Sequence, residues 1–171
     1  EEYYFTDGRV VIAGSQHSTA EGKKADYLLY HNGKPIAVVE AKDNKHSVGA
    51  GIQQAIDYAL ILDLQFAYSS NGDAFLEHDF TTGKERELKL DEFPTEEELY
   101  NRYLTFKNYT PEEQKIVETP FYYDAYSHEP RYYQRIAVDR TVEAIAKGQQ
   151  RVLVVMATGT GKTFTAFQII H

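Results

Sequence analysis

The feature that most constrains the fold is an apolar segment, residues 36–39, that ends in the charged tripeptide Glu40-Ala41-Lys42. Because side chains alternate between the two faces of a strand, Glu40 and Lys42 are expected on the same face. Charged side chains are seldom placed against a core unless they are paired or bind a metal. A second apolar segment follows Asp26. The sequence therefore predicts two adjacent strands that bring two carboxylates and a lysine together.

These charged side chains have the composition of a metal-dependent hydrolytic site. Hard cations such as Mg²⁺ prefer oxygen ligands, and Asp26, Glu40 and the backbone carbonyl of Ala41 would supply three of them. The metal would activate water against a phosphodiester, while Lys42 stabilises charge on the attacked phosphate or positions the water. The alternative is that Glu40 and Lys42 form an ordinary solvated pair on a surface strand.

The turn between the two predicted strands provides a geometric test of a shared metal. The strands are expected to pair as a hairpin around Asn32 and Gly33. A plain two-residue turn would point Asp26 and Glu40 to opposite faces, because a one-residue slip reverses the faces. A shared metal therefore requires an odd-length loop or a bulge. The simplest arrangement is a three-residue loop ending in a left-handed Gly33, with Asp26 opposite Val38 and diagonal to Glu40.

The hydrophobic pattern divides the chain into three zones. Residues 1–90 are predicted to be strand-rich, with one helix at 48–64 where apolar residues recur at helical spacing. Residues 91–129 form an acidic connector with two capped helix starts. Residues 130–171 are predicted to contain a helix, a buried strand at 151–155, a glycine loop and the start of another helix.

The predicted helix adds two polar residues to the charged strand pair. Gln54 and Tyr58 are one turn apart and lie on one helix face. Together with the acids and the lysine, this Q-x-x-x-Y spacing resembles the PD-(D/E)xK nuclease superfamily, in the branch that includes the R (restriction) subunit of type I restriction-modification enzymes. The resemblance covers about residues 20–80. The alternative is a helix with a partly covering tyrosine and solvated glutamines.

This resemblance implies a fold and a set of catalytic residues. The fold is α/β, with a restriction-endonuclease-like mixed sheet flanked by helices, and its first helix would lie before residue 1. The implied catalytic residues are Asp26, Glu40, Lys42, Gln54 and Tyr58. The implied metal ligands are Asp26, Glu40 and the Ala41 carbonyl.

A second motif lies near the end of the chain, where an apolar segment leads into the glycine-rich residues 156–163. The order strand, loop and helix is the one that a phosphate-binding loop requires. Met156 stands where the strict pattern has glycine, and this departure resembles motif I of superfamily 2 helicases and translocases. Lys162 would reach the β- and γ-phosphates of ATP, and Thr163 would contact its Mg²⁺. The implied ATP-binding residues of the loop are Thr158, Gly159, Thr160, Gly161, Lys162 and Thr163.

The segment 130–134 supports an ATP-dependent motor. It opens a helix and resembles the Q-motif region of such motors, in which a glutamine reads the adenine edge and an aromatic ring stacks on the base. Gln134 is the adenine candidate, and Tyr132 or Tyr133 is the stacking candidate. The alternative is a helix start with amphipathic tyrosines.

The combined resemblance implies an ATP-dependent type I restriction endonuclease. Residues 1–90 would be the nuclease domain, 91–129 a helical connector, and 130–171 the first strand and phosphate-binding loop of a RecA-like motor. The implied cofactors are Mg²⁺ and ATP. The implied partners are double-stranded DNA and the methyltransferase (M) and specificity (S) subunits, in the cytoplasm of a prokaryote. The alternatives are a catalytically inactive nuclease-like module that binds DNA or docks, and a nuclease-helicase of another defence system.

Composition sets limits on these interpretations. The chain contains no cysteine, which excludes disulfides and thiolate metal sites. No apolar run approaches the roughly 18 residues needed to span a bilayer. The net charge of −8 argues against nucleic-acid binding over the whole surface, but it is compatible with local positive clefts. Since the chain begins Glu-Glu and ends within a helical pattern, we expect it to be part of a longer protein. Because the second acidic helicase motif would then lie beyond His171, we expect this chain not to hydrolyse ATP alone.

Overall fold

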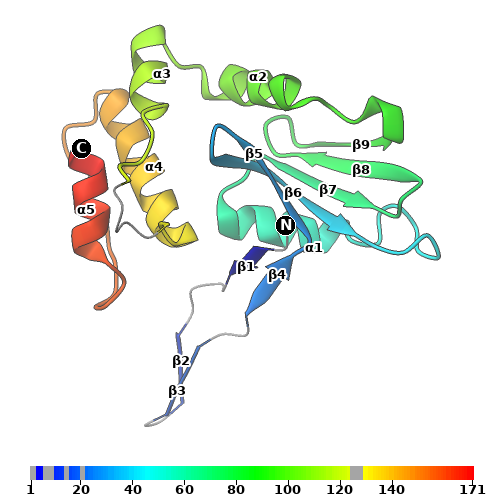
Figure 1. Ribbon diagram of the computed structural model, residues 1–171, viewed down its shortest axis with the longest axis horizontal. Helices are drawn as coiled ribbons and strands as arrows, with labels where there is room; N and C mark the ends of the chain where they lie inside the picture. Colours follow the sequence, from blue (N-terminus) through cyan, green and yellow to red (C-terminus); the bar gives the residue numbers. More distant parts are fainter. Residues whose placement is uncertain (1–2, 6–9, 14–15, 20–21, 124–128) are drawn as a thin grey trace. The chain divides into compact units, whose positions relative to one another are not determined.

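The computed structural model describes residues 3–5, 10–13, 16–19, 22–123 and 129–171. It forms two compact units, Glu1–Lys107 and Asn108–His171. The first unit contains a sheet with helices, and the second is helical among the residues described (Figure 1). Within these residues, no helix is both long and apolar enough to cross a bilayer.

The first unit is built on a five-stranded sheet with the strand order β5-β6-β7-β8-β9 (Figure 1). Its strands are β5 (Tyr27–His31), β6 (Lys34–Ala41), β7 (Phe66–Ser70), β8 (Ala74–Asp79) and β9 (Lys84–Lys89). The central pair, β6 and β7, is parallel, and the other pairs are antiparallel. Parallel strands need a crossover, which here contains helix α1 (Ile52–Leu62). The sheet is therefore mixed.

Helices cover both faces of this sheet. On β7, Ser69 accepts a hydrogen bond from the backbone of Gly51 at the start of α1. The preceding Tyr68 points to the opposite face, where it joins an ion cluster with helix α2 (Glu96–Lys107). Coverage on both faces explains why residues 36–40 of β6 are all buried, without the usual alternation. The predicted α/β fold, a mixed sheet flanked by helices, is confirmed.

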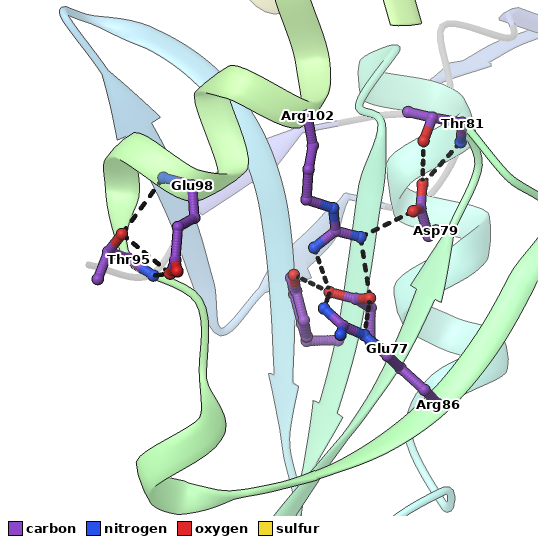
Figure 2. Close-up of polar contacts among 8 residues, drawn as sticks. Glu77, Asp79, Thr81, Arg86, Thr95, Glu98 and Arg102 are labelled. Atoms are coloured by element: carbon purple, nitrogen blue, oxygen red, sulfur yellow. Dashed lines mark hydrogen bonds and ion pairs between the residues drawn. The ribbon is translucent and has the colours of Figure 1, made fainter. Parts of the chain in front are cut away.

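The ion cluster centres on Glu77, whose side chain is 1% exposed. Its carboxylate accepts hydrogen bonds from Tyr68, Arg86 and Arg102, and Arg102 also bonds Asp79 (Figure 2). Burial alone would raise the pKa of Glu77, but these three donors, Arg102 foremost, hold that pKa below its ordinary value. The cluster fixes α2 to β8 and β9.

The β5–β6 hairpin contains a bulge, and it differs from the three-residue loop that the sequence suggested. Asn32 and Gly33 form a two-residue turn with φ values of 47° and 76°. Two positive φ values match the strand twist, so the Asn-Gly turn needs no third residue. The register shifts instead at Ile36, next to Pro35, which has no N–H to give to the ladder. The required bulge is confirmed, and its predicted position at Gly33 is wrong.

Two short ribbons precede this hairpin. Strand β1 (Tyr3–Phe5) pairs antiparallel with β4 (Lys23–Ala25), and β2 (Val10–Ala13) pairs antiparallel with β3 (Gln16–Thr19). After β9, the 3₁₀ turn η1 (Leu90–Glu92) leads toward α2. The β1–β4 ribbon ends immediately before Asp26 and thus adjoins the candidate site.

The second unit contains α3 (Pro111–Val117), α4 (Tyr132–Ala146) and α5 (Lys162–Ile170). Helix α3 has the predicted cap, since Thr110 accepts from the backbone of Glu113 while the Glu113 side chain accepts from the backbone of Thr110.

The predicted buried strand at 151–155 is wrong. These residues have no strand assignment, and the side chains of Leu153 and Val155 are 88% and 85% exposed. A strand needs a neighbour to satisfy its backbone N–H and C=O groups. The described residues of the second unit include no strand that could pair with this segment, so its apolar pattern alone does not make it one.

Candidate functional site

The end of β6 brings Asp26 and Glu40 together. A carboxylate oxygen of Asp26 accepts a hydrogen bond of 2.9 Å from the backbone N–H of Ala41. In return, Glu40 Oε1 lies 3.4 Å from the backbone nitrogen of Asp26. Leu28, rather than Asp26, lies opposite Val38. The predicted pairing was therefore wrong in register, yet the bulge still brings the two acids side by side.

Lys42, Gln54 and Tyr58 extend the site from β6 onto α1. The ammonium of Lys42 lies 3.6 Å from Glu40 Oε2 and donates to the side-chain oxygen of Gln54 at 3.0 Å. The amide nitrogen of Gln54 then donates to the hydroxyl of Tyr58 at 3.0 Å. Helical spacing makes this last contact possible, because residues four apart lie on one face. Four side chains thus form one continuous polar group, and Asp26 lies beside it.

The carboxyl group of Glu40 has an unusual environment. Its side chain is 1% exposed, and burial is the main cause that raises its pKa, followed by the negative charge of Asp26. The Asp26 backbone N–H and the Lys42 ammonium act in the opposite direction but are outweighed, so the pKa of Glu40 is about 7. A buried acid with a second acid beside it is typical of functional sites.

The residues at this edge fit a hard divalent cation. Asp26 and Glu40 provide two carboxylates. The negative charge of Asp26 raises the pKa of Glu40, and a cation between the two carboxylates would offset this repulsion. The Ala41 N–H points to Asp26. Because the N–H and the C=O of one strand residue point to the same side of the strand, the Ala41 carbonyl also lies on the side of Asp26. Among the described residues, no cluster of three or more His, Cys, Asp or Glu side chains could hold a metal. Backbone and water would complete the shell, as is common for Mg²⁺.

Sequence reasoning missed the contribution of Gly51. A Cβ at this position would lie 2.9 Å from the hydroxyl of Ser69 and 3.2 Å from both Glu40 Cβ and Lys42 Cε. Gly51 therefore lets the start of α1 approach β6 and β7 closely enough for Gln54 to reach the lysine. Its φ of −99° is ordinary, so space rather than backbone conformation demands glycine. The only sequence signal was a glycine before a predicted helix, and many helices begin that way.

The glycine-rich loop at 156–163 leads directly into α5. Gly159 and Gly161 have φ values of 78° and 84°, which side chains other than glycine rarely adopt. The ammonium of Lys162 donates to the carbonyl of Ala157 at 3.0 Å, so it lies over the loop. The exposed N-terminus of α5 adds positive potential and backbone N–H groups that have no partner within the helix. This arrangement suits an anion such as a phosphate.

Gln134 connects α4 to this loop. Its side-chain nitrogen donates to the carbonyl of Thr160 at 2.8 Å, and its oxygen accepts from the backbone of Arg131 at 2.9 Å. The side chain is buried, with both ends of the amide engaged inside the protein. Its predicted role in reading adenine stays a prediction, and it would require these hydrogen bonds to be exchanged for bonds to the base.

Comparison with known proteins identifies relatives for both parts of the chain. Residues 10–86 match the family "Type I restriction enzyme R protein N terminus", and residues 127–171 match "Type III restriction enzyme, res subunit". The chain is 45% identical over 175 residues to the type I restriction enzyme EcoAI endonuclease subunit of Escherichia coli. It is 29% identical over 196 residues to the EcoKI endonuclease subunit of E. coli strain K12.

A solved structure is also similar. This structure is described as a fragment of an HsdR subunit of a type I restriction enzyme from Vibrio vulnificus YJ016, with 49% identity and a TM-score of 0.81. The alignments with the EcoAI subunit and the Vibrio chain each cover 99% of this chain, but they cover 22% of the EcoAI subunit and 32% of the Vibrio chain. The alignment with the EcoKI subunit covers 85% of this chain and 16% of that subunit. The chain thus spans less than a third of the length of each of these relatives. The resemblance to type I R subunits that the sequence suggested is confirmed.

Proposed function

We propose that this chain is the N-terminal part of the R subunit of an ATP-dependent type I restriction endonuclease. The complete enzyme would hydrolyse DNA phosphodiesters with Mg²⁺ after ATP-driven translocation along the duplex. The observation that carries the proposal is the continuous polar group from Glu40 through Lys42 and Gln54 to Tyr58, with Asp26 beside it. The similarity to proteins named as restriction endonuclease subunits supports it.

The proposed division of the chain follows the motifs. Residues 1–90 form the nuclease domain, 91–129 a helical connector, and 130–171 the start of a RecA-like motor. Arg102 in the connector bonds Glu77 of the nuclease sheet, and the first compact unit extends to Lys107.

In the nuclease domain, each side chain has a distinct task. Asp26, Glu40 and the Ala41 carbonyl would hold Mg²⁺, which would supply Lewis-acid activation of water and offset negative charge at the phosphate. Lys42 directs its ammonium to the attacked phosphate. Because a lysine stem is flexible, the hydrogen bond to Gln54 keeps this ammonium beside Glu40 rather than in solvent. Tyr58 takes the other end of the Gln54 amide and so fixes its orientation.

In the motor part, the loop at 156–163 binds the phosphates of ATP. The backbone at Gly159 and Gly161 would approach the phosphate oxygens, Lys162 would contact the β- and γ-phosphates, and Thr163 would contact the Mg²⁺ of ATP. Lys162→Ala in the complete enzyme is expected to abolish ATP hydrolysis, measured by phosphate release. Hydrolysis at the unaltered rate would contradict this assignment.

The implied partners follow from this role. The substrate is double-stranded DNA, and the protein would assemble with methyltransferase (M) and specificity (S) subunits in the cytoplasm of a prokaryote. The recognised DNA sequence would belong to the specificity subunit.

The decisive experiment compares two glutamines on α1. Gln54 joins the polar group, whereas Gln53 is exposed and donates to Asp57 on another face of the same helix. In the complete enzyme with ATP and Mg²⁺, Gln54→Ala should lower the DNA cleavage rate by about tenfold, the effect of losing a group that orients an active-site residue. Gln53→Ala should leave the rate unchanged, and both variants should hydrolyse ATP normally.

Asp26→Ala provides the stronger test of the metal site. It should abolish cleavage while ATP hydrolysis persists, and cleavage at the unaltered rate would refute the proposal. If the unaltered enzyme binds DNA and hydrolyses ATP but never cuts, the chain is instead an inactive nuclease-like docking module.

A further inference from the structure

The β1–β4 ribbon presents two neighbouring lysines to opposite faces. Phe5 pairs with Lys23, and Tyr4 pairs with Lys24. Directly opposed residues of an antiparallel pair share a face, and successive residues alternate. Lys23 therefore lies on the face of Phe5, while Lys24 lies on the other face with the exposed ring of Tyr4.

The face of Lys23 is the one that adjoins the candidate nuclease site. Phe5 is buried and makes an edge contact with the ring of Tyr58, with ring centroids 5.0 Å apart. The ammonium of Lys23 lies 6.0 Å from the centroid of that same ring. Tyr58 is the last member of the polar group that begins at Glu40. The ribbon thus adds a cation beside the Tyr58 end of this polar group.

Lys23 is also close to the metal ligands along the chain. Strand β4 ends at Ala25, which is fully buried, and Asp26 follows directly. Because buried Ala25 and Phe5 anchor the ribbon, Lys23 is held at a fixed place beside the site. Its side chain is only partly buried, so the ammonium can still meet a ligand from solvent.

We propose that Lys23 contacts a backbone phosphate of the DNA strand being cut, next to the phosphate held at Asp26, Glu40 and Lys42. This proposal rests on the proposed nuclease function and names a further substrate-binding residue for it. Phosphates of one strand follow one another every 3.4 Å along the helix axis, so a strand that places one phosphate in the site must present others beside it. The protein carries a net charge of −8, so DNA binding needs local cations at the place where the backbone passes.

The two lysines of the ribbon form a matched pair for the test. Lys23→Gln and Lys24→Gln remove the same charge from adjacent residues of one strand, on opposite faces. Binding of the 171-residue chain to a fluorescent DNA duplex is measured by anisotropy without added Mg²⁺, from 50 to 200 mM salt. Loss of one phosphate contact reduces the slope of log K against log[salt] by about 0.9.

Lys23→Gln is expected to show this reduced slope, so its affinity deficit should shrink by about threefold between 50 and 200 mM salt. Lys24→Gln should keep the unaltered slope, and Lys23→Arg should restore it because the cation is retained. Equal slopes for the two glutamine variants would overturn the proposal. Circular dichroism of each variant excludes unfolding as the cause, and a Lys23→Gln chain that unfolds is replaced by Lys23→Met.

The Lys23 contact and the proposed nuclease function can each fail without the other. If Asp26→Ala abolishes cutting but Lys23→Gln binds DNA with the unaltered slope, the nuclease assignment stands and the Lys23 contact is wrong. If Lys23→Gln lowers the slope but Asp26→Ala cuts normally, the DNA contact stands and the assigned catalytic residues are wrong.

Discussion

The ion cluster under α2 makes a quantitative prediction about stability. Replacing Arg102 with methionine keeps most of its apolar stem but removes three hydrogen bonds, two to Glu77 and one to Asp79. The guanidinium also lies 4.6 Å from the ring centroid of Phe66, a contact that would be lost. Figure 2 shows that Arg102 is the group that reaches both acids (Figure 2).

The size of the effect follows from burial. Breaking a fully buried ion pair costs about 3–5 kcal/mol, because an acid is left without its partner. Arg102 is 27% exposed, and Glu77 keeps Arg86 and Tyr68, so we expect the lower end, about 3 kcal/mol. Arg86 is the matched control, since it binds the same carboxylate but is 52% exposed. Arg86→Met should cost about 1 kcal/mol or less.

The assay is urea unfolding followed by circular dichroism, at neutral and acidic pH. The pKa values of Glu77 and Asp79 are held below their ordinary values in the folded protein. Their stabilisation is therefore complete above the unfolded-state pKa of about 4 and is lost as the pH falls through the lowered folded pKa. The difference between unaltered protein and Arg102→Met should shrink in acid. Equal costs for the Arg102 and Arg86 variants at neutral pH would refute this account of the cluster.

Two further predictions concern glycines beside the candidate sites. Gly51→Ala should force α1 away from Glu40 and Lys42 and lower the DNA cleavage rate of the complete enzyme by about tenfold; a variant that cuts at the unaltered rate would show that the close approach is not needed. Gly161→Ala combines a φ of 84° with a clash between the new Cβ and the Gln134 amide. The substitution should therefore lower the free energy of unfolding by about 1–3 kcal/mol, measured by urea unfolding, and weaken ATP binding in the complete enzyme. Unchanged stability and unchanged ATP affinity would contradict this expectation.

Much of the first compact unit could be predicted, because its local sequence patterns agree with a sheet that is covered on both faces. The apolar run before Glu40 gave a central strand, and helical spacing around Gln54 gave α1. The need for a bulge also followed, because strand faces alternate strictly. Its location did not, since both an extended loop at Gly33 and a shift at Ile36 satisfy the same face requirement. The choice depended on Pro35, which favours a break in the ladder at its own position.

Other features could not be read from local sequence because they depend on distant partners. Gly51 matters through the side chains of Glu40, Lys42 and Ser69, which no local pattern reveals. The apolar segment 151–155 has a strand-like composition, yet a strand forms only beside another strand. In both cases the structure depends on tertiary contacts that the local sequence does not reveal.

We propose that the charged end of β6 cuts DNA while the glycine loop serves a separate motor. The most direct measurement follows DNA cleavage and ATP hydrolysis in one reaction of the complete enzyme carrying Lys42→Ala. Lys42 bonds Gln54 and lies beside Glu40, far along the chain from the loop at 156–163. We expect the Lys42→Ala enzyme to hydrolyse ATP at the unaltered rate and to lose DNA cleavage. Cleavage at the unaltered rate would contradict it.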